Sequence, residues 1–416
     1  MRALLASAVL LLSGCGQYSL ADVGADIPEE FAWAGANSET GQVRDLQGLE
    51  NLALSFPDST SVRLRLLNAQ LEAEAYEDLL GTLSWLNERG YVFSSTARAQ
   101  IPKLVGEEFA ERATNLLREH PDPLERSKVV AMVPAAAGLV ESVLMDLEGG
   151  NIAVSSVSGK NLWGKGPRGN WSDHTLEGAG NLSGIVYDPG RALVLAASGK
   201  IDGSDASQPY FSGLVGIRFP GDTPRFFPAP VGSNLSDLHR SPDGTIYASD
   251  PLGGGIYRLL PGAEIIEILV APGTFRSPQG LVTSNDGKGL YVSDYRYGLA
   301  AVDLDSGDVH RVPAKGPFPL DGIYGLWRRG DELIAVQNGT SPMRIVAFQL
   351  SPDGKSVVSQ RNLELSHRDW TEPLSGYLGP DALYYVGNGQ WDRWVAGQPA
   401  QDKPFVPTQI RRLPLD

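Results

Sequence analysis

The sequence predicts a mainly β protein, a six-bladed β-propeller preceded by a small α-helical segment. A two-strand phrase recurs from residue 129 onward at a spacing of roughly 42 to 51 residues, within the range of propeller blades. Gly and Pro occur 48 and 29 times, which suits short strands joined by tight turns. Hydrophobic residues make up 42% and charged residues 20% of the 416 positions, so we expect a globular chain with two structured parts.

Residues 1–14 have the pattern of an export signal. Arg2 precedes an apolar stretch over 3–12 that only Ser7 interrupts, and Leu12-Ser13-Gly14-Cys15 follows. This stretch is too short to span a bilayer as a helix. The arrangement resembles a bacterial lipoprotein signal, which implies cleavage before Cys15 and its lipidation. The alternative is an ordinary signal peptide with an incidental cysteine.

The residue after the cysteine bears on localisation. Gly16 stands there, and by resemblance to the Gram-negative sorting rule this favours the outer membrane, facing the periplasm. We therefore expect a cell-envelope protein that meets the membrane through its lipid anchor only. Cys15 is the only cysteine of the chain, so no internal disulfide is possible.

Two segments separate the signal from the propeller. Residues 15–57 lack periodicity and are predicted to be a tether and irregular lead-in. Residues 58–127 show helical spacing of leucines and are predicted to form helical hairpins. The first hairpin ends at Gly90, the second covers 95–104 and 107–118, and Pro121 and Pro123 block continuation.

The first hairpin resembles a tetratricopeptide unit. Its leucines and Tyr76 stand where that repeat places its packing residues, although Leu79 replaces the usual small residue. One and a half units cannot bury their own apolar face, so we expect the segment to pack on the propeller. Either it offers a docking groove for a partner or it is a structural cap.

Residues 128–416 carry the propeller phrases, each an inner strand, a turn and a second strand. Asp243-Gly244, Asp286-Gly287 and Gly149-Gly150 supply the positive φ that the turns need. Residues 128–133 and 409–413 together are expected to complete the sixth blade and close the ring. The phrases open at Glu141, Ser183, Ser236, Gln279, Tyr324 and Ser375.

The residues that open the phrases are candidates for one mouth of the central channel. They offer one carboxylate, one amide oxygen and several hydroxyls, a mixed oxygen set that suits a hard cation such as Ca²⁺. Asp321, three residues before Tyr324, and Asp237, beside Ser236, add carboxylates if their loops fold inward.

The phrases resemble those of the regucalcin/gluconolactonase/luciferin-regenerating-enzyme family (SMP-30-like). The motifs that carry this resemblance are Glu141-Ser142-Val143, Ser277-Pro278-Gln279-Gly280-Leu281 and Ser241-Pro242-Asp243-Gly244. The family consists of six-bladed propellers that bind a divalent cation at the channel mouth and, where enzymatic, hydrolyse lactones. The resemblance covers about residues 129–416. It implies a divalent-cation cofactor such as Ca²⁺.

Carried over position by position, the family's ligands meet departures in this chain. Glu141 matches the glutamate ligand, and Gln279 replaces an asparagine. The aspartate ligand corresponds either to Asp321, when the Asp-Gly dipeptide is followed, or to Tyr324, when the strand is counted back. Ser236 stands where the family has another asparagine. The glutamate is kept, one amide is exchanged, and the aspartate is displaced or lost.

Two functions follow from these residues. The first is a binding lipoprotein that holds a small-molecule ligand or an envelope protein at the propeller mouth. The alternative is a divalent-cation-dependent hydrolase of lactone-like substrates, with Asp237 as the candidate catalytic base. Asp237 is otherwise a turn residue that opens a strand. A net charge of -14 without a basic patch excludes nucleic acid as a partner.

Overall fold

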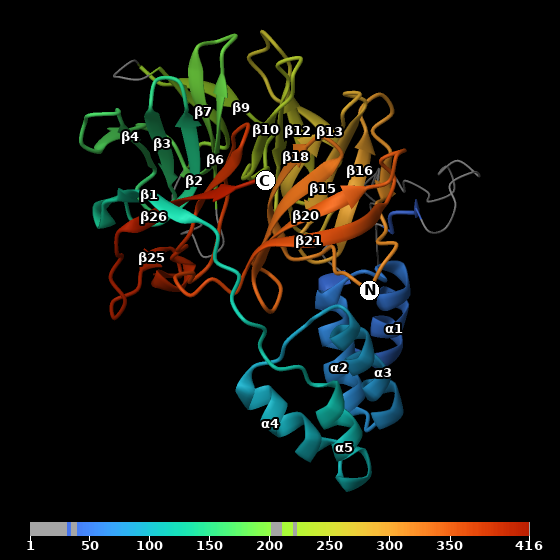
Figure 1. The fold of residues 1–416 in the computed structure, drawn as a ribbon. Coiled ribbons are helices and arrows are strands. Elements are labelled where there is room, and N and C mark those ends of the chain that lie inside the picture. Colours follow the sequence, from blue (N-terminus) through green and yellow to red (C-terminus); the bar gives the residue numbers. More distant parts are fainter. Residues whose placement is uncertain (1–30, 35–39, 201–209, 219–222, 416) are drawn as a thin grey trace, which may run out of the picture.

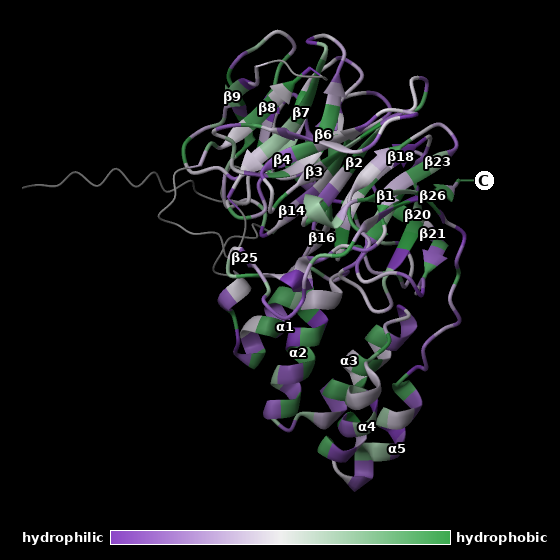
Figure 2. Ribbon diagram, turned by 90° about the vertical axis from the view of Figure 1, so that its left-hand side faces the viewer, coloured by the Kyte–Doolittle hydropathy of each residue, from purple (hydrophilic) through white to green (hydrophobic). Residues whose placement is uncertain are grey.

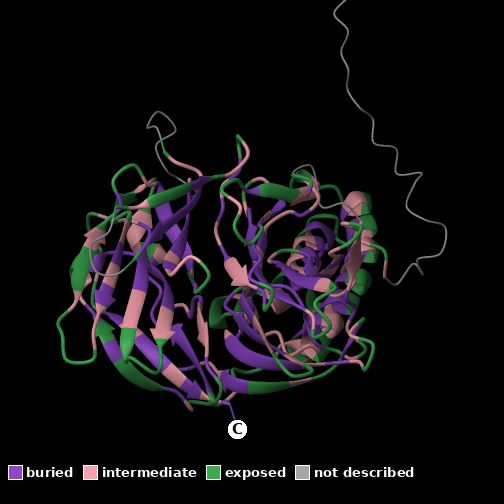
Figure 3. Cartoon of the chain, turned by 90° about the horizontal axis from the view of Figure 1, so that it is seen from above, coloured by how far each residue is buried: buried purple, intermediate pink, exposed green. Residues whose placement is uncertain are grey.

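The computed structural model describes residues 31–34, 40–200, 210–218 and 223–415. Six four-stranded antiparallel sheets stand around a central axis (Figure 1). Seen from above, the strands are mostly buried, whereas exposed residues gather in the loops and along the outer edge (Figure 3). This architecture confirms the predicted six-bladed β-propeller. Cys15 lies outside the described residues, so its lipidation stays a prediction.

Five blades are built from four consecutive strands each. Blade 1 contains β2 (Val140–Asp146), β3 (Asn151–Ser156), β4 (Asn161–Lys165) and β5 (Ser172–Thr175). Blade 2 contains β6 (Asn181–Asp188), β7 (Leu193–Gly199), β8 (Gly213–Ile217) and β9 (Arg225–Pro228). Blade 3 contains β10 (Leu238–Arg240), β11 (Ile246–Ser249), β12 (Ile256–Leu259) and β13 (Glu267–Val270). Blade 4 contains β14 (Pro278–Thr283), β15 (Gly289–Asp294), β16 (Gly298–Asp303) and β17 (Val309–Arg311). Blade 5 contains β18 (Ile323–Arg329), β19 (Glu332–Gln337), β20 (Arg344–Leu350) and β21 (Val357–Leu365).

The sixth blade joins the two ends of the propeller. Its strand order is β22 (Gly376–Leu378), β23 (Ala382–Val386), β26 (Thr408–Pro414) and β1 (Lys128–Val133). The antiparallel pairing of β1 with β26 runs from Lys128 opposite Arg412 to Val133 opposite Thr408. The predicted closure of the ring by residues from both ends is confirmed. A small hairpin, β24 (Trp394–Val395) with β25 (Gln398–Pro399), follows the turn η5 (Trp391–Arg393).

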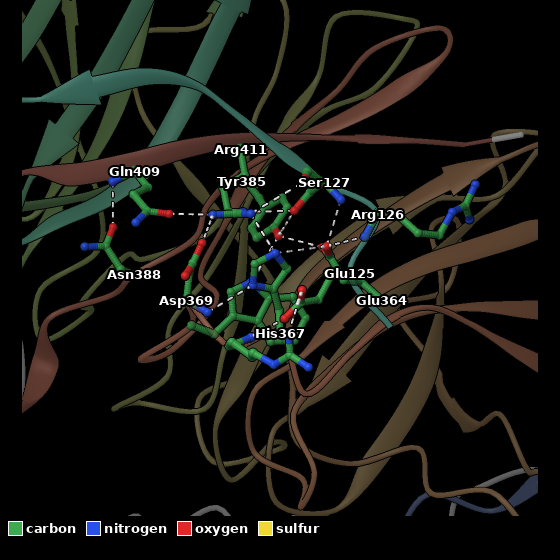
Figure 4. A network of polar contacts seen from close by, with 12 residues as sticks. Glu125, Arg126, Ser127, Glu364, His367, Asp369, Tyr385, Asn388, Gln409 and Arg411 are labelled. Atoms are coloured by element: carbon green, nitrogen blue, oxygen red, sulfur yellow. Dashed lines mark hydrogen bonds and ion pairs between the residues drawn. The ribbon is translucent and has the colours of Figure 1, made fainter. Parts of the chain in front are cut away.

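A buried polar network secures this closure (Figure 4). Glu364, at the end of β21, accepts hydrogen bonds from the backbone N–H groups of Arg126 at 3.0 Å and Ser127 at 2.8 Å. Its second oxygen accepts from the Tyr385 hydroxyl at 2.7 Å. Arg411 of β26 donates through Nε to Ser127 Oγ at 2.9 Å. The network therefore ties the segment entering β1 to the blade that the C-terminal strand completes.

Glycines with positive φ form the hairpin turns that the sequence predicts. The φ angles are 70° at Gly150, 93° at Gly244 and 70° at Gly287. In blade 3, Asp243 Oδ1 accepts a hydrogen bond from the Thr245 N–H at 2.9 Å, which holds the turn closed.

Hydrophobic clusters fill the space between neighbouring blades. Val282 of blade 4 packs with Leu326 and Phe348 of blade 5, and Val143 of blade 1 packs with Val386 of blade 6. Burying one such side chain contributes about 1.5–3 kcal/mol relative to leaving it exposed. The ring is thus stabilised mainly by contacts between consecutive blades.

The helical segment contains the two predicted hairpins, and no helix among the described residues is both long and apolar enough to span a membrane. The first predicted hairpin is α2 (Thr60–Glu72) and α3 (Tyr76–Glu88), and the second is α4 (Ser95–Leu104) and α5 (Glu107–Leu116). The short 3₁₀ turns η3 (Thr40–Gln42) and η4 (Ala135–Ala137) precede α1 (Leu46–Ser55) and β2. Hydrophobic and hydrophilic patches alternate around these helices (Figure 2).

One helix lies in the segment that was expected to be irregular. Helix α1 (Leu46–Ser55) begins at Asp45, whose carboxylate accepts a hydrogen bond from the Gly48 N–H. The expectation of irregular structure is wrong over these residues. Leu49, Leu52 and Ala53 are buried at helical spacing, but the run is short and is stabilised by its contact with α2 and Tyr297.

The helices lie beneath blades 4 and 5 (Figure 1). Ser59 Oγ donates to the Arg296 carbonyl at 2.6 Å, and Asp58 forms an ion pair with Arg311 at 3.0 Å. The backbone N–H of Val92 donates to the Ser341 carbonyl at 2.8 Å. The predicted packing of the helical segment on the propeller is therefore confirmed.

Candidate functional site

A narrow central cavity lies where the inner strands of the blades meet. Its volume is about 20 Å³, which leaves room for about one water molecule. In blades 1 to 5 the lining residue is the one that follows the residue opening each phrase. Only in blade 6 does the opening residue itself, Ser375, line the cavity. The polar and glycine residues of the lining are Ser142, Gly184, Asp237, Gly280, Gly325, Ser375 and Gly376.

The shift by one residue has a structural cause. The inner strands of blades 1, 2, 4 and 5 each contain an irregular register near their first residues, between positions 140 and 143, 182 and 185, 278 and 281, and 323 and 325. A bulge interrupts the alternation of side chains along a strand. The expectation that the opening residues face the channel assumed regular alternation.

Glycines let the inner strands approach one another closely. The Gly184 N–H of blade 2 donates at 2.9 Å to the carbonyl of Ser236, which stands just before β10 in blade 3. A Cβ on Gly184 would lie 2.6 Å from that oxygen, and a Cβ on Gly280 would lie 2.5 Å from the backbone nitrogen of Leu326. The channel is therefore narrowed by backbone contacts rather than by large side chains.

Glu141 of β2 is buried, with 2% of its surface exposed. Its Oε2 atom has no hydrogen-bond partner within the described part of the chain. Burial raises the pKa of this carboxyl well above its usual range, and the nearby charges of Asp237 and Glu372 raise the pKa further, whereas the Trp391 side chain lowers it. Burial therefore favours the neutral form of Glu141, and a ligand that supplies a donor or a positive charge would favour the ionised form.

Asp237 stands directly before β10 and lines the central cavity. Its backbone N–H donates to Ser249 Oγ at 3.3 Å, whereas its Oδ2 atom is buried without a partner among the described residues. Burial raises the pKa of Asp237 to about 7. Glu141 and Asp237, which we call the acid pair, come from blades 1 and 3 and interact electrostatically.

Glu372 is a third acid that the sequence reasoning missed. Burial, followed by the charge of Asp392, raises its pKa to about 7. Its Oε1 accepts a hydrogen bond from Asn338 Nδ2 at 3.4 Å. The signal was present in the sequence, because Glu372 stands three residues before Ser375, as Asp321 stands three residues before Tyr324.

Asp321 is engaged with the helical segment. Its Oδ2 accepts a hydrogen bond from the Ser61 N–H, at the start of α2, at 2.7 Å. Burial raises the pKa of Asp321 to about 6, against the lowering effect of the backbone hydrogen bond from Ser61. This carboxylate binds the positive end of the α2 dipole and thereby holds the helices on the propeller.

The remaining predicted positions serve packing and backbone contacts. Tyr324 makes an edge-on contact with Tyr295 at 6.4 Å between ring centroids. Ser183 Oγ donates to the Ser236 carbonyl at 3.0 Å. Gln279 is partly buried in β14. The structure thus relates Glu141 to Asp237 and Glu372, but not to the other positions carried over as ligands.

These residues do not fit the divalent cation that the family resemblance implies. Across residues 31–34, 40–200, 210–218 and 223–415, no three His, Cys, Asp or Glu side chains form a group able to hold a metal ion. Asp321 is occupied by α2, and Tyr324 is in an aromatic contact. The chemistry of the site therefore depends on the acid pair.

The fold is similar to that of several solved structures. A gluconolactonase from Xanthomonas campestris is 14% identical, with a TM-score of 0.48 over 72% of this chain and 99% of that chain. A luciferin-regenerating enzyme is 14% identical, with a TM-score of 0.46 over 70% and 95%. Regucalcin from Agrobacterium tumefaciens, a calcium-binding protein, is 16% identical, with a TM-score of 0.44 over 68% and 95%.

These three proteins are propellers of the type that the sequence motifs resemble. Other similar structures include a virginiamycin B lyase from Staphylococcus aureus, so the similarity concerns the fold alone. No protein-family model and no curated protein matches the chain.

Proposed function

We propose that this propeller is a binding protein whose acid pair receives a small molecule rich in hydrogen-bond donors, such as a hydroxyl or ammonium compound. The observation that carries the proposal is the pair of buried oxygens without donors, Glu141 Oε2 and Asp237 Oδ2. A buried polar atom without a partner costs about 1–3 kcal/mol. A ligand that donates to these two oxygens recovers that free energy on binding.

The raised pKa values couple this binding to protons. Asp237, with a pKa of about 7, is mostly protonated at pH 6 and mostly ionised at pH 8. A cationic ligand binds the ionised form and releases the proton. Its affinity should therefore rise about tenfold per pH unit below pH 7 and level off above it.

Hydrolysis of lactone-like substrates is the second candidate function. One observation favours it, because a carboxyl with a pKa of about 7 suits a general base at neutral pH. The cavity beside Asp237, at about 20 Å³, admits one group of about the size of a water molecule, such as an ammonium or hydroxyl group, and not a lactone ring. We therefore place binding before catalysis.

The proposal extends to the cell envelope. We propose that Cys15 anchors the chain to the outer membrane, so that the propeller binds its ligand, or an envelope protein, in the periplasm. Replacement of Cys15 by Ser should release the protein from the membrane fraction. Retention of Cys15→Ser in that fraction would contradict lipid anchoring.

Calorimetric titration of the soluble chain starting after Cys15 tests the acid pair. The probes are ethanolamine, glucose, CaCl₂ and glucono-δ-lactone, each at pH 6 and pH 8. We expect saturable binding of ethanolamine, through its ammonium group, that Glu141→Gln and Asp237→Asn weaken by about tenfold or more. Glu148→Gln, on the exposed turn of blade 1, is the matched control.

Each result assigns the site differently. Saturable Ca²⁺ binding lost in Glu141→Gln, together with turnover of the lactone, would replace the binding proposal by the hydrolase. Absence of saturable binding with every probe, or binding unchanged in both variants, would refute the proposal.

A further inference from the structure

A second cavity lies between the helical segment and blade 5, away from the acid pair. Its volume is about 250 Å³. The end of α3 and the chain after α5 form one wall, and strands β20 and β21 form the other. We call it the interdomain groove. Its charged and amide residues are Glu88, Arg89, Arg118, Glu119, Arg344, Gln360 and Asn362.

Arg344 is the buried cation of the interdomain groove, with 5% of its surface exposed. Its Nε donates to Gln337 Oε1 at 2.8 Å. Its two terminal nitrogens make no hydrogen bond or ion pair with any residue that the structure describes. Burial lowers the pKa of Arg344 to about 10, against the raising effect of the Asp321 charge. The Asp321 charge thus acts on Arg344 without a hydrogen bond or ion pair, so the terminal nitrogens remain available to an anion in the groove.

Two further arginines line the same groove from the helical side. The Arg89 guanidinium stacks on the Trp85 ring at 4.0 Å, and its Nε is buried without an acceptor among the described residues. Arg118 donates through Nε to Asn87 Oδ1 at 3.0 Å. The contacting residues Trp85 and Asn87 carry no charge. The charges of Asp58 and Glu88 act on Arg89 without forming an ion pair with it.

Among the described residues, the two glutamates of the groove form no ion pair with its arginines. Glu119 is exposed and forms an ion pair at 3.7 Å with Arg98, a residue that does not line the groove. Glu88 is also exposed, and its Oε1 accepts a hydrogen bond from Ser84 Oγ at 3.1 Å. The groove lining thus has three arginines against two glutamates, in a chain whose net charge is -14.

We propose that the interdomain groove binds a small organic anion, a hydroxycarboxylate, with Arg344, Arg89 and Arg118 as its carboxylate-binding residues. Arginine presents a planar fork of donors that matches a carboxylate. This site is independent of the acid pair and goes beyond the proposed function.

The rest of the lining specifies the ligand further. Val92, Pro342 and Leu365 form apolar surface that suits a carbon skeleton. Gln360 Oε1 is a buried acceptor without a donor in the described chain, and it suits a ligand hydroxyl. The volume is smaller than the roughly 300–1,000 Å³ of pockets for drug-sized ligands, so a short chain such as that of malate or citrate fits.

Occupation of the groove has a mechanical consequence. The ligand contacts α3 and the chain after α5 on one side and blade 5 on the other. It therefore links the helical segment to the propeller next to the hydrogen bonds between Val92 and Ser341. Binding should stabilise the docked position of the helices, because a ligand of the native state raises its stability by mass action.

The test titrates the soluble chain starting after Cys15 with malate, citrate and inorganic phosphate at constant ionic strength. We expect saturable binding of malate or citrate, weakened about tenfold or more in Arg118→Ala and in Arg344→Gln. Arg112→Ala is the matched control, because Arg112 is an exposed arginine of α5 that pairs with Glu77 outside the groove. Hydrogen exchange should slow at residues 90–92 and 117–121 when malate saturates the protein.

Arg118 is exposed, so Arg118→Ala tests the proposal even if Arg344→Gln fails to fold. Saturable binding of phosphate without binding of either carboxylate would overturn the assignment of the ligand class. Absence of saturable binding, or equal affinity in Arg118→Ala, Arg89→Ala and the native chain, would overturn the site itself.

Discussion

Two buried acidic centres of the propeller have opposite hydrogen-bonding states. Glu364, beside the closing blade, accepts hydrogen bonds from two backbone N–H groups and the Tyr385 hydroxyl (Figure 4). The acid pair, at the centre of the ring, has one buried oxygen without a donor on each carboxyl among the described residues. Both centres are buried to a similar degree, so burial alone does not distinguish a structural carboxylate from a candidate binding site.

The basic residue of the network around Glu364, Arg411, also has hydrogen-bond partners within the protein. Arg411 donates to His367 Nε2 at 2.6 Å and to Asp369 Oδ2 at 3.2 Å. Each charge at this centre therefore has a partner supplied by the protein. The two unpartnered oxygens of the acid pair lack such hydrogen bonds among the described residues, and the proposed ligand would supply them.

Glu364→Ala should have the largest effect on stability. Removing one member of a buried ionic network typically costs about 3–5 kcal/mol, because the remaining groups lose their partner. Urea unfolding of the native chain and the variant measures this loss. Glu148→Ala, on an exposed turn, should change stability by less than about 0.5 kcal/mol. Equal stability of Glu364→Ala and the native chain would contradict the structural role of this network.

Asp237→Asn should raise the free energy of unfolding, whereas Glu364→Ala should lower it. The pKa of Asp237 is about 7 in the folded chain and 3.8 as the reference value. The unfavourable contribution of this carboxyl is absent below about pH 4, grows as the pH rises, and is complete above pH 7. At roughly 1.4 kcal/mol per pKa unit, the variant should gain about 2–4 kcal/mol at pH 8 and almost nothing at pH 4.

Thermal unfolding of Asp237→Asn and the native chain at both pH values measures this gain. The stability of Asp237→Asn is compared with that of the native chain at each pH. If the variant lost stability at pH 8 relative to pH 4 in this comparison, Asp237 would have a protein partner. The contrast with Glu364 would then disappear.

Asp321→Ala tests an intermediate case, a carboxylate with one bonded oxygen and one without a partner in the described chain. Loss of the hydrogen bond from Ser61 should cost about 1–2 kcal/mol, because that N–H stays buried at the start of α2. The effect should be local, with faster proteolysis at residues 46–116 and unchanged protection of the blades. Uniform loss of protection across the propeller would contradict a docking role.

Glu372→Gln should have the smallest effect. The pKa of Glu372 is raised to about 7, as for Asp237, but this side chain is partly exposed and accepts a hydrogen bond from Asn338. We expect a gain of about 1 kcal/mol or less at pH 8, after allowance for solvent screening. A gain larger than that of Asp237→Asn would place the centre of the site nearer blade 6.

The sequence predicted the repeat, the six blades, the closing strands and four of the five helices. These features follow from local patterns, because strand alternation, helical spacing and turn glycines act over a few residues. Helix α1 was missed because it is short and depends on contacts with Tyr297 and α2. The channel lining was displaced by one residue, since bulges interrupt the alternation that the prediction assumed.

The sequence by itself determined the architecture of this protein, together with Glu141 and Asp237 as candidate residues. Only the tertiary structure decided which acids have partners. Glu141 and Asp237 lie in blades 1 and 3, Asp321 meets a helix from residue 61, and Arg344 meets the end of α3 in the interdomain groove. Hydrogen bonding and pKa depend on atoms brought together from distant parts of the chain, and no local pattern contains that information.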